Sequence, residues 1–65
     1  KNNIRVQRAV VRITQQQLAE QIGVSRQTIN AIESGKFIPS TLLALKIART
    51  FRQPVEAIFQ LEEED

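Results

Sequence analysis

The side chains of this sequence that are best suited to specific recognition lie close together, between positions 26 and 30. Arg26 ends in a guanidinium that matches the acceptor groups of guanine. Gln27 and Asn30 end in amides that match adenine, each through two hydrogen bonds. Thr28 can contact a thymine methyl group or a phosphate. An ordinary polar helix face is the alternative interpretation, and the residues around this stretch decide between the two.

Most other kinds of site lack the residues that they need. The chain contains no histidine and no cysteine, so nucleophilic triads, disulfides and the common metal sites cannot form. The acidic run at 62–65 is expected to be a mobile, solvated tail rather than a cation site. No glycine-rich phosphate loop is present. We therefore predict a protein that is not an enzyme and that uses no cofactor and no metal.

Two short helices joined by a tight turn are predicted to hold residues 26–30 in place. Thr14 and Gln17 form the T-x-x-Q pattern of a capping box, and Gly23 supplies the left-handed residue that ends many helices. Ser25 is a second N-cap. Apolar residues recur at helical spacing between these signals, so one face of each helix is predicted to be buried.

Residues 14–35 resemble the helix-turn-helix of the phage Cro and repressor (Xre-type) family. In a frame that begins at Gln15, the family requires a small residue, a glycine and five apolar residues at fixed positions. The chain meets these requirements with Leu18, Ala19, Ile22, Gly23, Val24, Ile29 and Ile32. The resemblance covers nearly all of the chain and implies an all-α, five-helix, lambda-repressor-like DNA-binding domain over residues 1–61. One branch of these small stand-alone repressors adds a short terminal two-stranded β-sheet.

The remaining helices are predicted from the same kinds of signal. We expect a first helix over residues 4–12 with Asn3 as its cap, and a fourth from Ser40 to Phe51. A fifth, short helix begins at Pro54. Residues 59–61 alternate as a strand does and are the candidate for the terminal sheet.

Five positions depart from the family pattern, and the first is Gln7, where the family usually has leucine. Val6 and Val10 stand where the family usually has polar residues, and they are either exposed surface valines or contacts to a second subunit. Arg12 and Arg52 stand where the family often has glycine.

The resemblance also implies roles for residues outside 26–30. The reading helix would lie in the major groove of duplex DNA. Arg8 and Glu33 would form a partly buried ion pair that fixes the orientation of two helices, with two exposed charges as the alternative. Contacts to the DNA backbone are implied for Gln15, Gln16, Ser25, Lys36, Ser40 and Thr41.

The charge distribution favours a nucleic-acid partner over a membrane. The net charge is +2, but residues 1–61 carry nine Lys and Arg against three Glu, a net charge of +6. Such a basic body is typical of a nucleic-acid binder, although a solvated surface with an acidic tail is also consistent with it. No apolar run of membrane-spanning length and no signal-peptide pattern is found, so we expect a cytoplasmic protein.

A homodimer on a pseudo-palindromic operator is expected, because a single module of this size covers only roughly 600–1,000 Å² on DNA. The expected dimer seam is the apolar cluster of Val55, Ile58, Phe59 and Leu61, although Ile58 could equally belong to a local core. The predicted function is that of a sequence-specific transcriptional regulator, acting as a repressor. The alternative is an antitoxin or adaptor module whose main partner is another protein.

Overall fold

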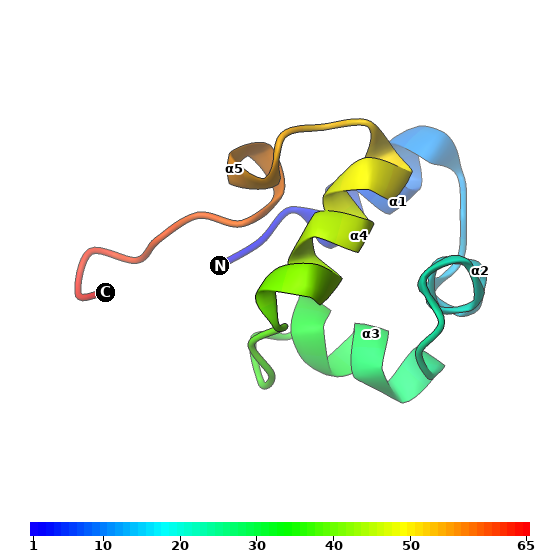
Figure 1. Cartoon of the computed structure of the whole chain (residues 1–65), viewed down its shortest axis with the longest axis horizontal. Coiled ribbons are helices and arrows are strands. Elements are labelled where there is room, and N and C mark those ends of the chain that lie inside the picture. Colours follow the sequence, from blue (N-terminus) through cyan, green and yellow to red (C-terminus); the bar gives the residue numbers. More distant parts are fainter.

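The computed structural model describes residues 1–65 and contains five helices and no named strand. The helices are α1 (Ile4–Val11), α2 (Gln15–Ile22), α3 (Arg26–Glu33), α4 (Thr41–Phe51) and α5 (Val55–Ile58). Helix α4 contacts α1, α2 and α5, and α2 also packs on α3, as Figure 1 shows from one side. The predicted all-α, five-helix architecture is confirmed. None of these helices has the length and apolar character needed to cross a bilayer.

Three of the helices begin at side-chain caps. Thr14 Oγ1 accepts from the Gln17 backbone N–H at 3.0 Å, and Gln17 Oε1 accepts from the Thr14 N–H at 2.8 Å, which confirms the capping box. Ser25 and Ser40 cap α3 and α4 by a single bond each, in which Oγ accepts from the backbone N–H of Thr28 and of Leu43. The predicted side-chain cap of α1 is wrong, because the Asn3 amide donates instead to a carbonyl near the end of α5.

Three helices end at a residue in the left-handed conformation. Gly23 ends α2 at a φ of 78°, which glycine adopts without strain. Arg12 ends α1 at a φ of 61° and Arg52 ends α4 at a φ of 55°. A residue with a Cβ is strained in the left-handed conformation, so each arginine lowers the stability of the fold by roughly 1–2 kcal/mol. This conformation explains why the family prefers glycine at both positions.

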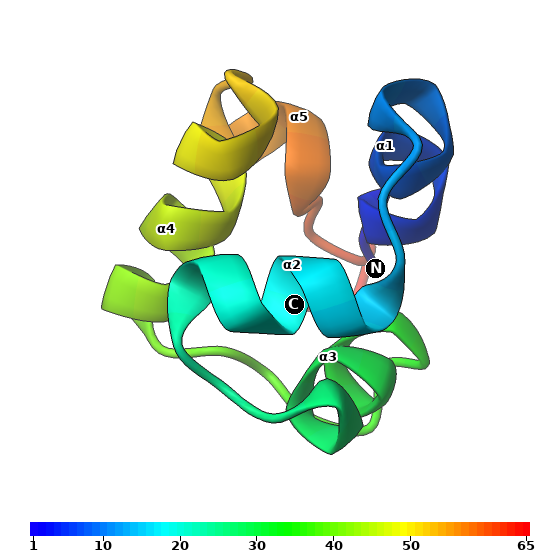
Figure 2. The same cartoon turned by 90° about the vertical axis from the view of Figure 1, so that its right-hand side faces the viewer.

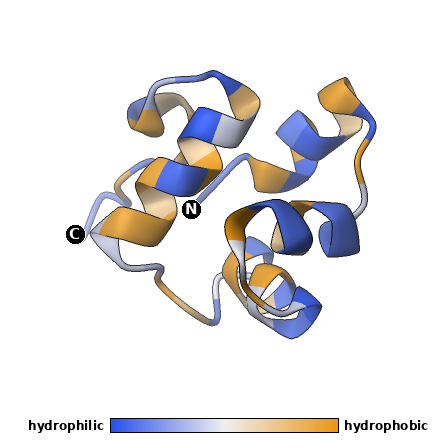
Figure 3. Cartoon of the chain, turned by 45° about the vertical axis from the view of Figure 1, so that its right-hand side comes forward, coloured by the Kyte–Doolittle hydropathy of each residue, from blue (hydrophilic) through white to orange (hydrophobic).

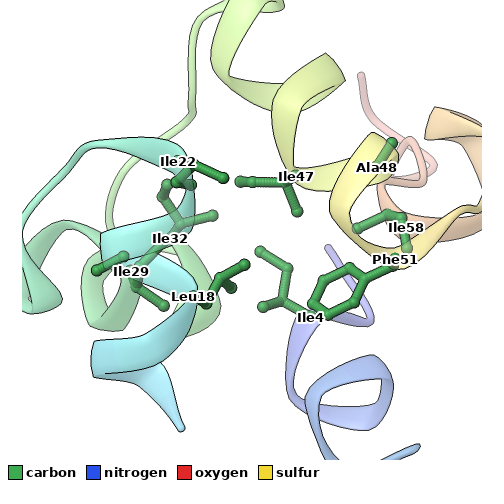
Figure 4. Packing of buried hydrophobic residues seen from close by; sticks show 10 residues of the cluster. Ile4, Leu18, Ile22, Ile29, Ile32, Ile47, Ala48, Phe51 and Ile58 are labelled. Atoms are coloured by element: carbon green, nitrogen blue, oxygen red, sulfur yellow. The ribbon is translucent and has the colours of Figure 1, made fainter. Parts of the chain in front are cut away.

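The core draws buried side chains from all five helices, and in Figure 4 they point toward one another. Figure 3 shows that hydrophobic and hydrophilic segments alternate along the helices, as expected when one face of each is buried. Ile58 is fully buried in this core, which is the second of the two roles considered for it. The ten core residues are Ile4, Leu18, Ala19, Ile22, Ile29, Ile32, Ile47, Ala48, Phe51 and Ile58.

The two ends of the chain lie side by side, but they do not form a sheet. A single antiparallel bridge joins Asn2 and Phe59. The Asn3 N–H donates to the Ile58 carbonyl at 2.8 Å, and the Gln60 N–H donates to the Lys1 carbonyl at 3.0 Å. The terminal two-stranded sheet of one family branch is thus reduced to an isolated bridge. Beyond it, residues 62–65 are exposed and stand away from the helices (Figure 1).

Candidate nucleic-acid interface

Helix α3 presents a polar face to solvent because its opposite face is anchored in the core. Ile29 and Ile32 are buried against the other helices. Arg26, Gln27 and Asn30 are exposed on the outer side. Figure 2 shows α3 at one edge of the domain with α2 packed directly above it. The three side chains predicted to read bases therefore share one accessible surface.

The hydroxyl groups of Thr28 and Ser25 are engaged with each other. Thr28 is half-buried, and its hydroxyl lies 3.0 Å from the hydroxyl of Ser25. Ser25 Oγ also accepts from the Thr28 backbone N–H at 3.2 Å, as the cap of α3. Both hydroxyl groups therefore stabilise the first turn of α3.

The predicted backbone contacts lie at the starts of two other helices. Gln15 and Gln16 open α2, and Thr41 follows the Ser40 cap as the first residue of α4. The first backbone N–H groups of a helix have no partner within it, and they favour an anion such as phosphate. Lys36 is exposed in the loop between α3 and α4 and makes no ion pair.

The two glutamines that open α2 have different surroundings. Gln16 is exposed, and its amide donates to Glu20 Oε2 at 3.1 Å on the same helix. Gln15 is half-buried and faces α3, where its amide donates to Glu33 Oε1 at 3.0 Å. Only the side chain of Gln16 is therefore directed away from α3.

Arg8 and Glu33 form the ion pair that joins α1 to α3. Arg8 Nε donates to Glu33 Oε2 at 2.5 Å, and Nη2 donates to Oε1 at 3.2 Å. The Glu33 side chain is 1% exposed, so the carboxylate is buried rather than free in solvent. Arg8 Nη1 also donates to the Ile13 carbonyl at 3.1 Å, which ties the loop before α2 to the same group.

Opposing effects act on the pKa of Glu33. Burial alone raises the pKa, because it penalises the charged carboxylate. Hydrogen bonds from Arg8 and Gln15, together with the charges of Arg8 and Arg5, outweigh burial and hold the pKa below its ordinary value. Glu33 is therefore ionised at neutral pH and keeps its attraction to both arginines.

Comparison with known proteins assigns residues 7–58 to a family described as helix-turn-helix. The chain belongs to the Xre-type helix-turn-helix family. YgzD of Bacillus subtilis, named an uncharacterized HTH-type transcriptional regulator, is 48% identical over all of this chain and 98% of its own length. A protein of the same description from Methanocaldococcus jannaschii is 49% identical over the same shares of both chains. One from Methanothermobacter thermautotrophicus is 48% identical over 94% of this chain and 90% of its own.

Membership of the helix-turn-helix family identifies which helices of this chain form the motif. The capped turn between α2 and α3 is the turn of the motif, and α3 is the helix that the family places in the major groove. The family also supports the prediction that this protein is not an enzyme.

Sequence reasoning missed two polar residues beside the motif. Arg5 Nε lies 3.7 Å from Glu33 Oε1, one helical turn before Arg8, and its spacing from Arg8 could have revealed it. The Asn2 amide donates to the Ile32 carbonyl at 2.8 Å and so ties the start of the chain to the end of α3. No local sequence pattern predicts this contact, because the two residues are brought together only by the fold.

An apolar groove beside the end of α3 was also missed. It has a volume of about 780 Å³ and lies between the α3–α4 loop and the two chain ends. Ile38 and Leu61 line it with exposed fractions of 87% and 84%. Phe59, half-buried, is a second predicted seam residue in its wall. Val55 is half-buried against the core and lies outside the groove.

Proposed function

We propose that this protein is a transcriptional regulator that recognises a specific operator by placing α3 in the major groove of duplex DNA. The proposal rests on the side chains of Arg26, Gln27 and Asn30. All three are exposed on a helix whose other face is buried. Their groups pair with guanine and adenine edges through two hydrogen bonds each. Thr28 adds a contact to a thymine methyl group or to a phosphate.

The sugar–phosphate backbone of the DNA would be held on both sides of these three side chains. On one side, α2 offers the N–H groups of its first turn, beginning at Gln15 and Gln16. On the other side, Lys36 supplies a positive charge, and Ser40 and Thr41 open α4. These contacts set the position of α3 in the groove without selecting a base sequence.

We propose that two copies bind together on a pseudo-palindromic operator. Two α3 helices on a two-fold axis would enter successive major grooves about 34–36 Å apart. A second copy doubles the contacted area of a single small module, which is otherwise only about 600–1,000 Å². Bound at a promoter, such a dimer would act as a repressor by occupying the site. Its proposed location is the cytoplasm, where its DNA target would lie.

The apolar groove is the proposed seam of this dimer. Exposed large apolar side chains that gather in one place are typical of interaction sites, and Ile38 and Leu61 gather here. Phe59 continues the apolar wall. The groove borders the C-terminal end of α3 and leaves residues 26–30 uncovered. A two-fold contact at this place therefore keeps both reading faces free for DNA.

The seam can be tested by placing a charge in it. Ile38→Glu should give a monomer in sedimentation equilibrium at concentrations where the wild type is dimeric. Val10→Glu is the matched control, because Val10, like Ile38, is an exposed β-branched apolar residue. Val10 is 69% exposed and lies on α1, outside the groove. Dissociation by Val10→Glu but not by Ile38→Glu would move the seam to α1.

A second candidate function is that of a protein-binding module, an antitoxin or adaptor. It is favoured by the exposed valines of α1, since Val6 and Val10 are 59% and 69% exposed. Gln27→Ala discriminates between the two functions. A DNA-reading regulator should lose binding to a duplex selected from random sequences, with its dimerisation unchanged. Failure of the wild type to enrich any sequence from such a pool would favour the adaptor.

A further inference from the structure

We propose that the outer face of α1 is a docking surface for an acidic, amphipathic helix of a partner protein. The face consists of Val6, Ala9 and Val10, with Arg12 at its end. This docking is additional to the proposed recognition of DNA and does not depend on it.

Helix α1 exposes more apolar side chains than it buries. Ile4 is its only buried residue, whereas Val6 and Val10 are 59% and 69% exposed. Val6, Ala9 and Val10 follow the i, i+3, i+4 spacing of neighbours on one helix face. Exposed apolar residues that gather in this way are typical of interaction sites. The small side chain of Ala9 between the two valines leaves room for the ridge of a second helix.

The residue that ends α1 is strained, although the fold makes no use of its charge. Arg12 has a φ of 61°, a conformation that glycine adopts more easily. Arg12 is exposed and takes part in none of the ion pairs of the chain. Strained backbone conformations of this kind cluster at functional sites. The guanidinium of Arg12 is therefore assigned to an anionic group outside the chain.

The charges of α1 favour an acidic protein over the other possible occupants. The helix carries Arg5 and Arg8 and no acidic residue, and Arg12 adds a third positive charge. Two copies that packed α1 against α1 would bring like charges together, which opposes such a contact. The phosphate backbone of DNA would match the charges but would offer no apolar surface to the valines. A helix with leucines beside glutamates matches both the valines and the arginine.

The docking face is turned away from the helix that is proposed to read DNA. On the other side of α1, Arg8 donates to Glu33 of α3. Val6 and Val10 are each two residues from Arg8, and residues at this spacing point to opposite sides of a helix. Figure 2 shows α1 at the outer edge of the domain. A partner on α1 therefore leaves residues 26–30 free for DNA.

Two matched pairs of variants separate this face from the rest of the surface. Val10→Ser removes an exposed apolar side chain from α1, and Leu45→Ser removes one from α4, where Leu45 is 52% exposed. Arg12→Gly removes a strained arginine from the end of α1, and Arg52→Gly removes one from the end of α4, with a φ of 55°. Leu45 and Arg52 belong neither to the proposed DNA contacts nor to the proposed dimer seam.

The first test titrates isotope-labelled protein, without DNA, with a synthetic helical peptide that has leucines at helical spacing among glutamates and alanines. The amide resonances of Val6, Val10 and Arg12 should shift, and a peptide with lysine in place of every glutamate should shift none of them. Shifts that fall instead on residues 26–30 or on the groove would overturn the proposal. Equal shifts with the lysine peptide, or no shift with the acidic one, would also overturn it.

The second test measures the affinity of each variant for the acidic peptide and its unfolding in urea. Val10→Ser should bind about tenfold more weakly and Arg12→Gly about fivefold, the sizes expected for one lost apolar contact and one lost exposed ion pair. Leu45→Ser and Arg52→Gly should bind as the wild type does. Both glycine variants should raise the midpoint of unfolding, because both relieve strain. An unchanged peptide affinity of Arg12→Gly would overturn the role of its side chain.

The third test addresses a second copy and DNA as occupants of this face. Val10→Glu should keep the oligomeric state of the wild type in sedimentation equilibrium, and its dissociation would make α1 a contact between copies and overturn the proposal. The peptide should bind equally well to the free protein and to its complex with a selected duplex, whereas competition would overturn the proposal. If the wild type selects no duplex, the proposed function fails, but the titration without DNA still decides whether α1 docks an acidic helix.

Discussion

Replacing Arg8 with methionine should destabilise this domain severely, because it leaves a buried charge without its main partner. The substitution removes both hydrogen bonds from the guanidinium to Glu33, whose side chain is 1% exposed. Breaking a buried ion pair in this way costs about 3–5 kcal/mol. A chain of 65 residues has a total free energy of unfolding of only about 3–10 kcal/mol. Arg8→Met should therefore lose a third or more of its stability, or fail to fold.

Urea unfolding followed by circular dichroism measures this cost, and Arg5→Met is the matched control. Arg5 approaches the same carboxylate at 3.7 Å, but its side chain is 76% exposed. Solvent screens such a pair, so Arg5→Met should cost less than about 1 kcal/mol. The double variant Arg8→Met with Glu33→Leu should recover much of the loss, because it removes the buried charge as well. Equal costs for Arg5→Met and Arg8→Met would refute this reasoning.

The pH dependence of stability should test the ion pair of Arg8 and Glu33 in a second way. The folded pKa of Glu33 is lowered, because the hydrogen bonds and charges of the arginines and of Gln15 outweigh the effect of burial. The stability that Glu33 contributes is thus present above its unfolded pKa and is lost as the pH falls through its folded pKa. In Arg8→Met a protonated Glu33 no longer buries a charge, so the difference from wild type should shrink in acid. A difference that stays constant down to the acid limb would contradict this account.

Three further predictions concern DNA contacts and a helix end. Lys36→Ala should weaken binding to all duplexes alike and lower the salt dependence by about one unit of slope; an unchanged slope would exclude Lys36 from the phosphate contacts. Arg26→Ala should cost about 1–3 kcal/mol at particular base pairs, seen by comparing selected and substituted duplexes, and an equal loss on every sequence would assign Arg26 to the backbone. Arg52→Gly should raise the free energy of urea unfolding by up to about 1 kcal/mol, because Arg52 has a φ of 55°. Arg49→Gly, inside α4, should lower that free energy by a similar amount, and two losses would show that Arg52 is not strained.

Local signals were sufficient to predict the helix-turn-helix itself. The caps at Thr14 and Ser25 and the stop at Gly23 act through hydrogen bonds and dihedral angles within a few residues, so a sequence pattern records them. The apolar spacing that buries Ile29 and Ile32 is likewise local. These residues fix which face of α3 is exposed, and hence which side chains are candidates for reading bases.

Contacts between distant segments could not be predicted in the same way. Asn3 looked like a cap because its type suits that role, but the carbonyl of Ala57 lies within its reach only in the folded chain. The contacts of Gln15 to α3 depend on how closely two helices pack. The groove at Ile38 depends on where the loop after α3 meets the chain ends. Each of these is a property of tertiary arrangement, which spacing along the sequence does not encode.

The central claim is that α3 is the surface that meets DNA, and titration of isotope-labelled protein with its selected duplex tests it most directly. The backbone amide resonances of residues 26–30 should shift or broaden most, followed by those at the starts of α2 and α4. A titration in which the exposed valine face of α1 responds and residues 26–30 remain unchanged would contradict it.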